Sequence, residues 1–456
     1  MLLNKKVFAV SILTSLISSN VNAGGFALIE NGASGMGNAY AGASAVAEDA
    51  STIYFNPAGL SKLDGQQILL AGHFISSKNA FTNNGSTIIS AFGGTAQSGG
   101  NAAAGSNSFI PTFFYSRKLN NKWSYGFGVT VPFGAAVEYS DTWVGRYHGV
   151  NTEISTLNIN PSASFKVNDK FSVGFGISAQ YIEATISNKI DSAAYCQGGL
   201  KAGALCNANN LTVANISNAT YDSGQTLSGD DWSMGWNIGL LYDLTESTKI
   251  GVSYRSKIVQ ALVGSVDFTV NSNLQTVLDH PAVNKALLQD TGISAGITLP
   301  ESFSLSLSHV VNEKWQLLAD ATWMRWERYN EVVIDFNNPV QANSTLSPNN
   351  KNQWRYSIGA SFKADAKQIY RVGVALDKTS VRSPAARLVR GPSNDRLWLS
   401  FGYGNKISDT LSFDIGYAHL FINDPTIANS HVLFGTINGS FEQAADILST
   451  QVSWHF

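Results

Sequence analysis

The stretch Ser304-Leu305-Ser306-Leu307-Ser308-His309 alternates serine with larger side chains, and a polar turn, Val311-Asn312-Glu313-Lys314, follows it closely. Successive side chains of a β-strand point to opposite faces of the sheet, so this stretch has one face of serines and another of larger residues. The same alternation sets Leu397, Leu399, Phe401 and Tyr403 against Trp398, Ser400, Gly402 and Gly404. Strands of this kind suit a transmembrane barrel, because one face meets lipid and the other meets the lumen.

The composition of the whole chain agrees with a barrel. Charged residues make up 14% of the 456 residues and hydrophobic residues 44%, with 41 glycines and 11 prolines. Soluble domains carry about 25% charged residues. Apart from the N-terminus, the sequence has no apolar run near the ~20 residues that a spanning helix needs. A closed barrel is the other structure that satisfies its backbone in lipid. The net charge of −2, without a basic stripe, argues against a nucleic-acid partner.

Six short polar turns recur along the chain and alternate with longer stretches rich in Gly, Asn, Ser and Pro. The turns are 119–122, 167–170, 243–247, 311–314, 364–367 and 406–409. Short periplasmic turns and long external loops are typical of bacterial outer-membrane barrels. We therefore predict an all-β fold, a 14-stranded antiparallel transmembrane β-barrel with both termini in the periplasm. The predicted strands are 66–75, 108–119, 122–139, 151–167, 170–188, 231–243, 248–268, 295–310, 314–336, 352–364, 367–379, 394–406, 410–422 and 443–456.

Aromatic residues near the strand ends support the membrane interpretation. Trp123, Trp315, Trp354 and Tyr370 fit interfacial girdles. The last strand ends Val452-Ser453-Trp454-His455-Phe456, a pattern that resembles the signal read by barrel-assembly machinery. We expect this machinery, and the lipid of the outer membrane, to be partners of the chain.

The N-terminus has the pattern of an export signal. Lys5 and Lys6 precede a short apolar run, Val7 to Ile17, and Val21-Asn22-Ala23 suits cleavage after residue 23. A transmembrane anchor is the alternative, but the run is too short to span a bilayer. We predict a signal peptide over 1–23, a helical hatch that plugs the lumen over 24–65, and the barrel over 66–456.

The two cysteines, Cys196 and Cys206, are separated by nine residues in a Gly/Ala/Asn-rich stretch. In an exported protein this spacing indicates a small disulfide loop. A metal site would need further ligands, and no His or acidic cluster accompanies the pair. We expect no metal and no cofactor.

Several stretches in order along the chain resemble the FadL family of outer-membrane long-chain fatty acid transporters. They are the N-terminal Gly25 to Gly42, the NPA stretch Asp49 to Ala58, Val131 to Gly134, Trp143 to Tyr147, Leu299 to Ser302, Trp354 to Gly359 and Pro392 to Ser400. The resemblance implies fourteen strands, an N-terminal hatch and an internal hydrophobic pocket that opens sideways into the bilayer. It also implies passive transport of a long-chain fatty acid.

Two features could form the gate that the resemblance implies. Proline cannot donate to a ladder and glycine weakens a strand, so Pro132-Phe133-Gly134 predicts a kink that opens the wall, or else an ordinary bulge. Phe26, the third residue after the predicted cleavage, would close the ligand pocket or would be a plain packing residue. We expect Asn56-Pro57-Ala58 to brace the hatch by turn geometry and hydrogen bonds to the wall.

The predicted loop over 269–294 has apolar residues at helical spacing, interrupted by His280-Pro281. They could form a surface groove that captures a hydrophobic ligand, or a small core within the loop, and the two interpretations can coexist. The residues are Leu274, Val277, Leu278, Val283, Leu287 and Leu288.

The nature of the cargo is open at this stage. A fatty-acid carboxylate favours a basic partner in a dry pocket, and the candidates by position are Lys189, Arg255, Arg325 and Arg328. Without such a partner, an aromatic or alkane hydrocarbon would suit the same architecture. An outer-membrane lipid hydrolase or adhesion protein is a weaker alternative. The stretch Gly292 to Gly296 matches G-x-S-x-G but lacks the strand–turn–helix context of a nucleophile. We therefore predict a transporter, acting as a monomer, and not an enzyme.

Overall fold

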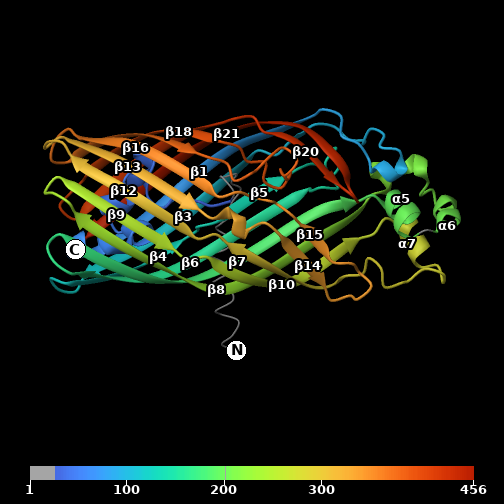
Figure 1. Cartoon of the computed structure of the whole chain (residues 1–456), viewed down its shortest axis with the longest axis horizontal. Coiled ribbons are helices and arrows are strands. Elements are labelled where there is room, and N and C mark those ends of the chain that lie inside the picture. Colours follow the sequence, from blue (N-terminus) through green and yellow to red (C-terminus); the bar gives the residue numbers. More distant parts are fainter. Residues whose placement is uncertain (1–25, 201) are drawn as a thin grey trace.

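The computed structural model describes residues 26–200 and 202–456, so the predicted signal peptide lies outside the described residues. The described chain forms one closed antiparallel barrel, with the C-terminus at the end of the short turns and the loop helices at the other end (Figure 1). The sheet closes because the last strand pairs with both the first strand and the one before it, as in Ile68 with Trp454 and Leu411 with Trp454. The prediction of a 14-stranded antiparallel barrel is confirmed.

Fourteen strands make the transmembrane wall, and seven more continue it on the loop side. The wall strands are β1 (Gln66–Asn83), β3 (Ser106–Lys118), β4 (Trp123–Thr130), β6 (Asn151–Lys166), β7 (Phe171–Ile190), β8 (Ser223–Asp243), β9 (Thr248–Arg255), β12 (Ser302–Val310), β13 (Trp315–Met324), β16 (Gln353–Lys363), β17 (Gln368–Asp377), β18 (Arg396–Lys406), β19 (Leu411–Ile422) and β21 (Gly435–His455). The others are β2 (Ala102–Ala103), β5 (Gly134–Glu138), β10 (Ile258–Thr269), β11 (Thr291–Leu299), β14 (Val332–Phe336), β15 (Ser344–Leu346) and β20 (Thr426–His431).

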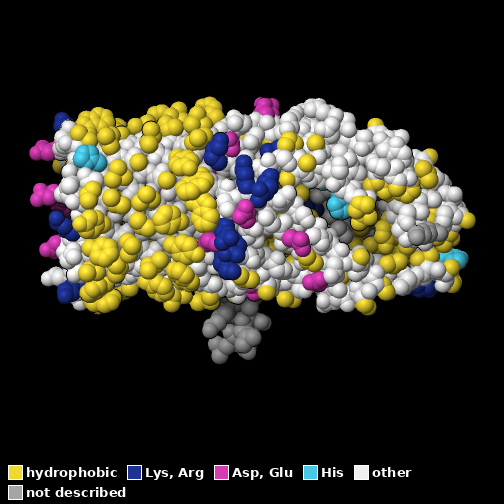
Figure 2. Space-filling model, viewed as in Figure 1, with side chains coloured by type: hydrophobic (Ala, Val, Ile, Leu, Met, Phe, Trp, Pro, Cys, Tyr) yellow, Lys and Arg dark blue, Asp and Glu magenta, His cyan; other side chains and the backbone are white. Residues whose placement is uncertain are grey.

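The outer face of the wall carries an apolar band toward the end with the short turns (Figure 2). Leu305 and Leu307 of β12 are 47% and 41% exposed, whereas Ser306 and Ser308 between and beside them are buried. The two faces therefore differ as the alternation predicts. The leucines on the outer face contact lipid and do not have to be buried inside the protein.

Side-chain oxygens hold the six short turns. Asn120, Asn168, Asn312 and Asp365 each accept hydrogen bonds from the backbone N–H groups two and three residues later. In the other two turns a hydroxyl accepts from the N–H two residues later. Short polar side chains of this kind mimic a backbone turn. The hairpins can therefore be located from short stretches of sequence.

Some predicted strand limits are wrong. β1 runs to Asn83, β8 starts at Ser223 and β21 starts at Gly435, because polar residues continue the ladders beyond the apolar band. Four predicted single strands are each divided in two, at 131–133, at 256–257, at 300–301 and at 325–331. Pro300 explains one break, since it has no N–H to donate.

Short helices precede β1 and lie inside the barrel. They are α2 (Ala33–Gly37), α3 (Ala43–Val46), α4 (Thr52–Phe55) and η1 (Pro57–Lys62). They contact strands around the whole inner wall, from β6, β7 and β8 to β17, β18 and β19. This segment therefore fills the lumen at the level of the apolar band.

The remaining helices lie mainly in the loops at the far end. They are η2 (Ser90–Phe92), α5 (Ser192–Ala194), η3 (Tyr195–Leu200), α6 (Gly203–Ala208), η4 (Val213–Asn215), η5 (Ala219–Tyr221), α7 (Ser272–Leu278) and η6 (Trp326–Arg328). Within the described chain, none of the helices has the length and apolarity required to cross a membrane.

Candidate functional site

The third wall strand is interrupted between β4 and β5, and the N-terminal segment occupies the interruption. Leu28 donates its N–H to the carbonyl of Pro132 at 2.9 Å, and Gly134 donates to the carbonyl of Phe26 at 2.8 Å. Ala27 pairs with Phe133 as an isolated antiparallel bridge. The N-terminal segment thus supplies ladder bonds to the wall strand where its regular pairing ends.

The neighbouring strand does not cover this interruption. β3 pairs with β4 from Phe113 to the short turn, whereas the part of β3 before Phe113 pairs with β1 and forms no ladder with β4 or β5 among the described residues. β5 pairs with β6. The ladder between β3 and the third strand therefore ends at Phe113.

On the side of β6, the hydroxyl of Thr156 forms hydrogen bonds with the backbone of Phe133 at the kink. It accepts from the N–H of Phe133 at 3.0 Å and donates to the carbonyl of the same residue. Both backbone groups of Phe133 are thereby satisfied without a strand partner, which removes much of the cost of leaving buried polar groups unpaired.

Phe26 closes a mainly apolar cavity of about 100 Å³ above the hatch. Its ring is 7% exposed, and its centroid lies 5.1 Å from that of Trp326, 5.2 Å from Tyr329 and 5.8 Å from Phe133. All three contacts are edge-to-face, a geometry that aromatic pairs favour. Ala135, Ile154, Ile186, Leu346 and Leu388 are among the other residues of the lining.

One cation, Arg390, lines this apolar cavity. Its guanidinium donates to the carbonyls of Asn151 at 2.8 Å and Ser187 at 3.0 Å, and to the hydroxyl of Thr152 at 3.0 Å. No carboxylate pairs with it within the described part of the chain. Burial lowers the pKa of Arg390 to about 10, so the guanidinium remains charged at neutral pH without an anionic partner.

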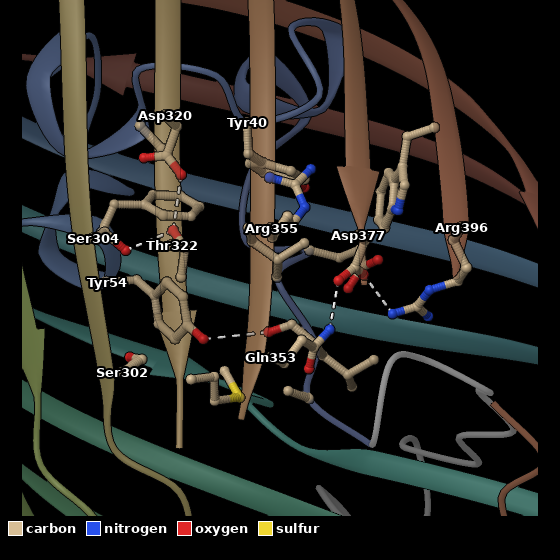
Figure 3. A pocket seen from close by; sticks show the side chains of 18 of the residues that line it. Tyr40, Tyr54, Ser302, Ser304, Asp320, Thr322, Gln353, Arg355, Asp377 and Arg396 are labelled. Atoms are coloured by element: carbon tan, nitrogen blue, oxygen red, sulfur yellow. Dashed lines mark hydrogen bonds and ion pairs between the residues drawn. The ribbon is translucent and has the colours of Figure 1, made fainter. Parts of the chain in front are cut away.

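A second cavity, of about 120 Å³, lies between the hatch and the wall, and charged and polar groups share its lining with apolar side chains (Figure 3). Three arginines and three acids line it. They are Arg255, Arg355, Arg396, Glu30, Asp320 and Asp377. Arg396 pairs with Asp377, and Arg355 donates to the carbonyl of Ala39 at 2.7 Å. The charges of this cavity are therefore balanced, in contrast to those of the cavity at Phe26.

The predicted carboxylate partners lie in three different places. Arg255 lines the cavity between the hatch and the wall, where it donates to the carbonyl of Tyr54 at 3.0 Å. Lys189 lines an external groove and pairs with Asp141 at 2.7 Å. Arg325 and Arg328 lie on the outer face and both pair with Glu301, so they are not part of the lumen. Arg390 was not among the candidates, because no motif marks it.

The NPA turn is packed against the wall at the base of the hatch. Asn56 donates to the carbonyls of Ser44 at 2.7 Å and Leu240 at 2.9 Å, and its side-chain oxygen accepts from the N–H of Ala58 at 3.0 Å. A Cβ at Gly239 would lie 1.8 Å from Oδ1 of Asn56. Glycine at this wall position is therefore required for the close approach of the turn.

The loop residues predicted as a capture groove divide between two environments. Leu274, Val277, Leu278 and Leu288 are at most 5% exposed and pack with Cys196 and Cys206, which form a disulfide. Val283 and Leu287 lie half-buried beside this loop core. Leu287 and Leu288 also line the external groove of about 760 Å³, together with Phe92 and the exposed Val432 and Leu433.

A plugged 14-stranded barrel with an apolar cavity at an interrupted wall strand defines the class of outer-membrane transport barrels. Comparison with known families agrees: the family described as outer membrane protein transport protein (OMPP1/FadL/TodX) matches residues 14–456. The chain belongs to this family, so it is an outer-membrane transport protein and not an enzyme.

Curated relatives and solved structures cover nearly the whole chain. Outer membrane protein P1 of Haemophilus influenzae is 28% identical over 429 residues, 91% of this chain and 90% of the relative. The long-chain fatty acid transport protein of Escherichia coli K12 is 26% identical over 428 residues, 90% and 91% of the two chains. The crystal structure of a Pseudomonas aeruginosa FadL homologue gives a TM-score of 0.84 at 23% identity, covering 95% of this chain and all of that one. The Ralstonia pickettii toluene transporter TbuX gives 0.66 at 17% identity, with 95% and 100% coverage. These structures share the fold.

Proposed function

We propose that this protein carries long-chain fatty acids passively from the external medium into the outer membrane. The observation that carries the proposal is the double role of Phe26. Its carbonyl is bonded to Gly134 in the interrupted strand, and its ring fills the apolar cavity. A ligand that displaces the ring would also loosen the backbone that completes the wall, so binding and lateral release would be coupled.

Capture would begin at the external groove. Val432 and Leu433 are 81% and 68% exposed there, beside Leu287 and Leu288. Exposed apolar patches of this kind mark binding sites for hydrophobic partners. The apolar loop core with the Cys196–Cys206 disulfide would hold this groove in shape.

Arg390 would then recognise the carboxylate. A half-buried cation without a carboxylate partner is costly, and an incoming anion would neutralise it with charge-assisted hydrogen bonds. Arg255 is a weaker candidate, since three acids already balance the arginines of its cavity. The name of the Escherichia coli relative supports the same cargo.

The release path would be the region between β3 and β5, where no ladder joins the two strands. Pro132, Phe133 and Gly134 would shape this opening. The NPA turn would keep the base of the hatch anchored to β8 while the tip at Phe26 moves. A passage of this kind needs neither nucleotide nor metal.

The two ends of the chain would serve export and assembly. Residues 1–23 would direct export and be removed, which would leave Phe26 near the new N-terminus. The terminal aromatic residues would be read by barrel-assembly machinery, and the closed wall would act as a monomer in the lipid.

A second cargo class has one observation in its favour. The rings of Phe26, Trp326 and Tyr329 would suit a monocyclic aromatic hydrocarbon, and the fold is shared with the toluene transporter TbuX. Arg390 favours the fatty acid, because a hydrocarbon leaves that cation without a partner.

Growth and uptake would test the assignment. A strain that lacks this gene and any paralogue is supplied with oleate, toluene or decane as its carbon source, with and without the gene on a plasmid. We expect restored oleate growth and labelled-oleate uptake with the plasmid. Normal oleate uptake in the deletion strain would overturn the fatty-acid assignment, and a defect confined to toluene would establish the hydrocarbon alternative.

A further inference from the structure

A row of cations lies on the outside of the barrel, at the loop-side edge of the apolar band (Figure 2). Its members lie in the segments at the loop-side ends of β9, β13, β16 and β17. They are Lys257, Arg325, Arg328, Lys351, Lys378 and Arg382. Strand pairing brings their segments side by side: Ser302 pairs with Arg255 and with Met324, and Met324 pairs with Gln353. Lys351 and Lys378 are bonded through their backbone N–H groups to Ser380 and Trp354 of the adjacent segments.

The row faces outward, by strand alternation for Arg325 and Lys378 and by solvent exposure for Lys257, Lys351 and Arg382. Met324, Gln353 and Asp377 line the cavity between the hatch and the wall, so their neighbours Arg325, Trp354 and Lys378 point to the other face. Lys257, Lys351, Lys378 and Arg382 are exposed. Directly below the row, Phe303, Trp354 and Tyr356 are 39%, 41% and 47% exposed. Aromatic residues at this depth are typical of the interface between acyl chains and head groups.

The row has more cations than anions to pair with them. Glu301 accepts from Arg325 and Arg328, Glu327 pairs with Arg382 at 3.1 Å, and Asp395 pairs with Lys378. Six cations thus share these three carboxylates, although the whole chain has a net charge of −2. Lys257 and Lys351 have no ion pair in the described part of the structure. The positive charge is therefore concentrated at one depth and is available to an external anion.

We infer that this row binds the phosphate groups of a phosphorylated glycolipid of the outer leaflet. The apolar band below would contact the acyl chains, and the cations would meet phosphates where those chains end. Arginine and lysine bind phosphate with charge-assisted hydrogen bonds, and basic residues at a membrane surface attract anionic head groups. This site is outside the barrel and independent of the cargo path.

The test uses three exposed lysines whose loss leaves the core untouched. The intact protein carrying Lys257→Gln, Lys351→Gln and Lys378→Gln is compared with a matched control that carries Lys122→Gln, Lys314→Gln and Lys367→Gln in the exposed short turns at the opposite rim. Binding of lipid A to each detergent-solubilised barrel is measured by native mass spectrometry. Lipid A stripped of both phosphates serves as the second probe, and heat-resistant migration verifies folding.

We expect the first triple variant to bind lipid A at least about tenfold more weakly than the wild type, and the control to bind as the wild type does. Dephosphorylated lipid A should bind the wild type as weakly as lipid A binds the first variant. Equal binding of lipid A by the wild type and the first variant would overturn the inference. Equal loss in the control, or equal binding of the dephosphorylated lipid by the wild type, would also overturn it.

Discussion

Gly134 donates its backbone N–H to the carbonyl oxygen of Phe26 at 2.8 Å, although the two residues belong to the wall and to the N-terminal segment. This bond links the tip of the hatch to the strand beside which the ladder is missing. Phe26 is also the residue that closes the apolar cavity. A single displacement could therefore empty space for the ligand and release the edge of the opening.

Replacing Gly134 by leucine should block release. Gly134 is buried beside the tip of the hatch, and a large side chain there would fill the region between β3 and β5. We expect labelled-oleate uptake by whole cells to fall at least about tenfold, because a blocked opening prevents the ligand from leaving the barrel. Glu138→Leu, at the exposed end of the same strand, is the matched control. Unchanged uptake by a correctly folded Gly134→Leu barrel would refute a role for the kink in release.

Replacing Arg390 by glutamine should weaken fatty-acid binding without weakening hydrocarbon binding. A hydrogen bond to a charged group contributes roughly 1.5–3 kcal/mol, so oleate affinity should fall by about tenfold to a hundredfold. Titration of the purified barrel with oleate and with decane measures both. Arg390→Lys should retain part of the oleate affinity because it keeps the charge.

Arg382→Gln is the control for the Arg390 experiment, since this residue lies on the same connection but is exposed on the outer surface. A parallel loss of oleate and decane affinity in Arg390→Gln would indicate a distorted cavity. An unchanged oleate affinity would show that the carboxylate is held elsewhere.

The external loops should loosen as the pH falls below neutrality. Burial, and then the nearby charges of His431 and Arg390, lower the pKa of His148 to about 3 in the folded loops. An unfolded loop would bind the proton near pH 6.5. The folded loops therefore lose stability progressively as the pH falls from about 6.5 toward 3, by at most about 1.4 kcal/mol per pH unit. The protection of the 139–150 amides against hydrogen exchange, corrected for the intrinsic exchange rate at each pH, should fall between pH 7.5 and 5.5.

His148→Phe should remove most of this pH dependence, because a ring of similar shape packs against Phe434 without titrating. The control is His280→Phe, at an exposed position in the 269–294 loop. This substitution should leave the pH dependence intact. An equal loss of protection in wild type and His148→Phe would assign the effect to other groups.

The architecture was predictable because its signals are local. Alternation of side chains and the Asx-type turns at Asn120 and Asn312 are properties of short stretches, and they fix the number and direction of strands. The breaks at 256–257 and 325–331 have no such signal. At the first of them a side chain replaces a ladder bond, because the hydroxyl of Ser256 accepts from the N–H of Trp236 in the neighbouring strand β8.

The site was predictable only in part, for the same reason. Pro132 and Gly134 mark a kink by their own chemistry. Arg390 has nothing in its neighbourhood of the sequence to mark it, because its partners Asn151 and Ser187 lie more than 200 residues away. The connection that carries it folds into the barrel, where Tyr139 donates to the carbonyl of Val389 at 2.9 Å.

Replacing Asn56 by alanine should loosen the hatch and make the barrel leaky. The substitution removes two bonds donated to Ser44 and Leu240 and one accepted from Ala58, all at a site that is 0% exposed. Each buried group left unsatisfied costs about 1–3 kcal/mol, enough to populate states in which η1 leaves the wall. We expect a higher single-channel conductance in planar bilayers and greater sensitivity of cells to vancomycin. Asn429→Ala, the same change in an exposed loop strand, should leave both unchanged. Unchanged conductance and vancomycin sensitivity in Asn56→Ala would show that the remaining contacts of η1 suffice to hold the plug.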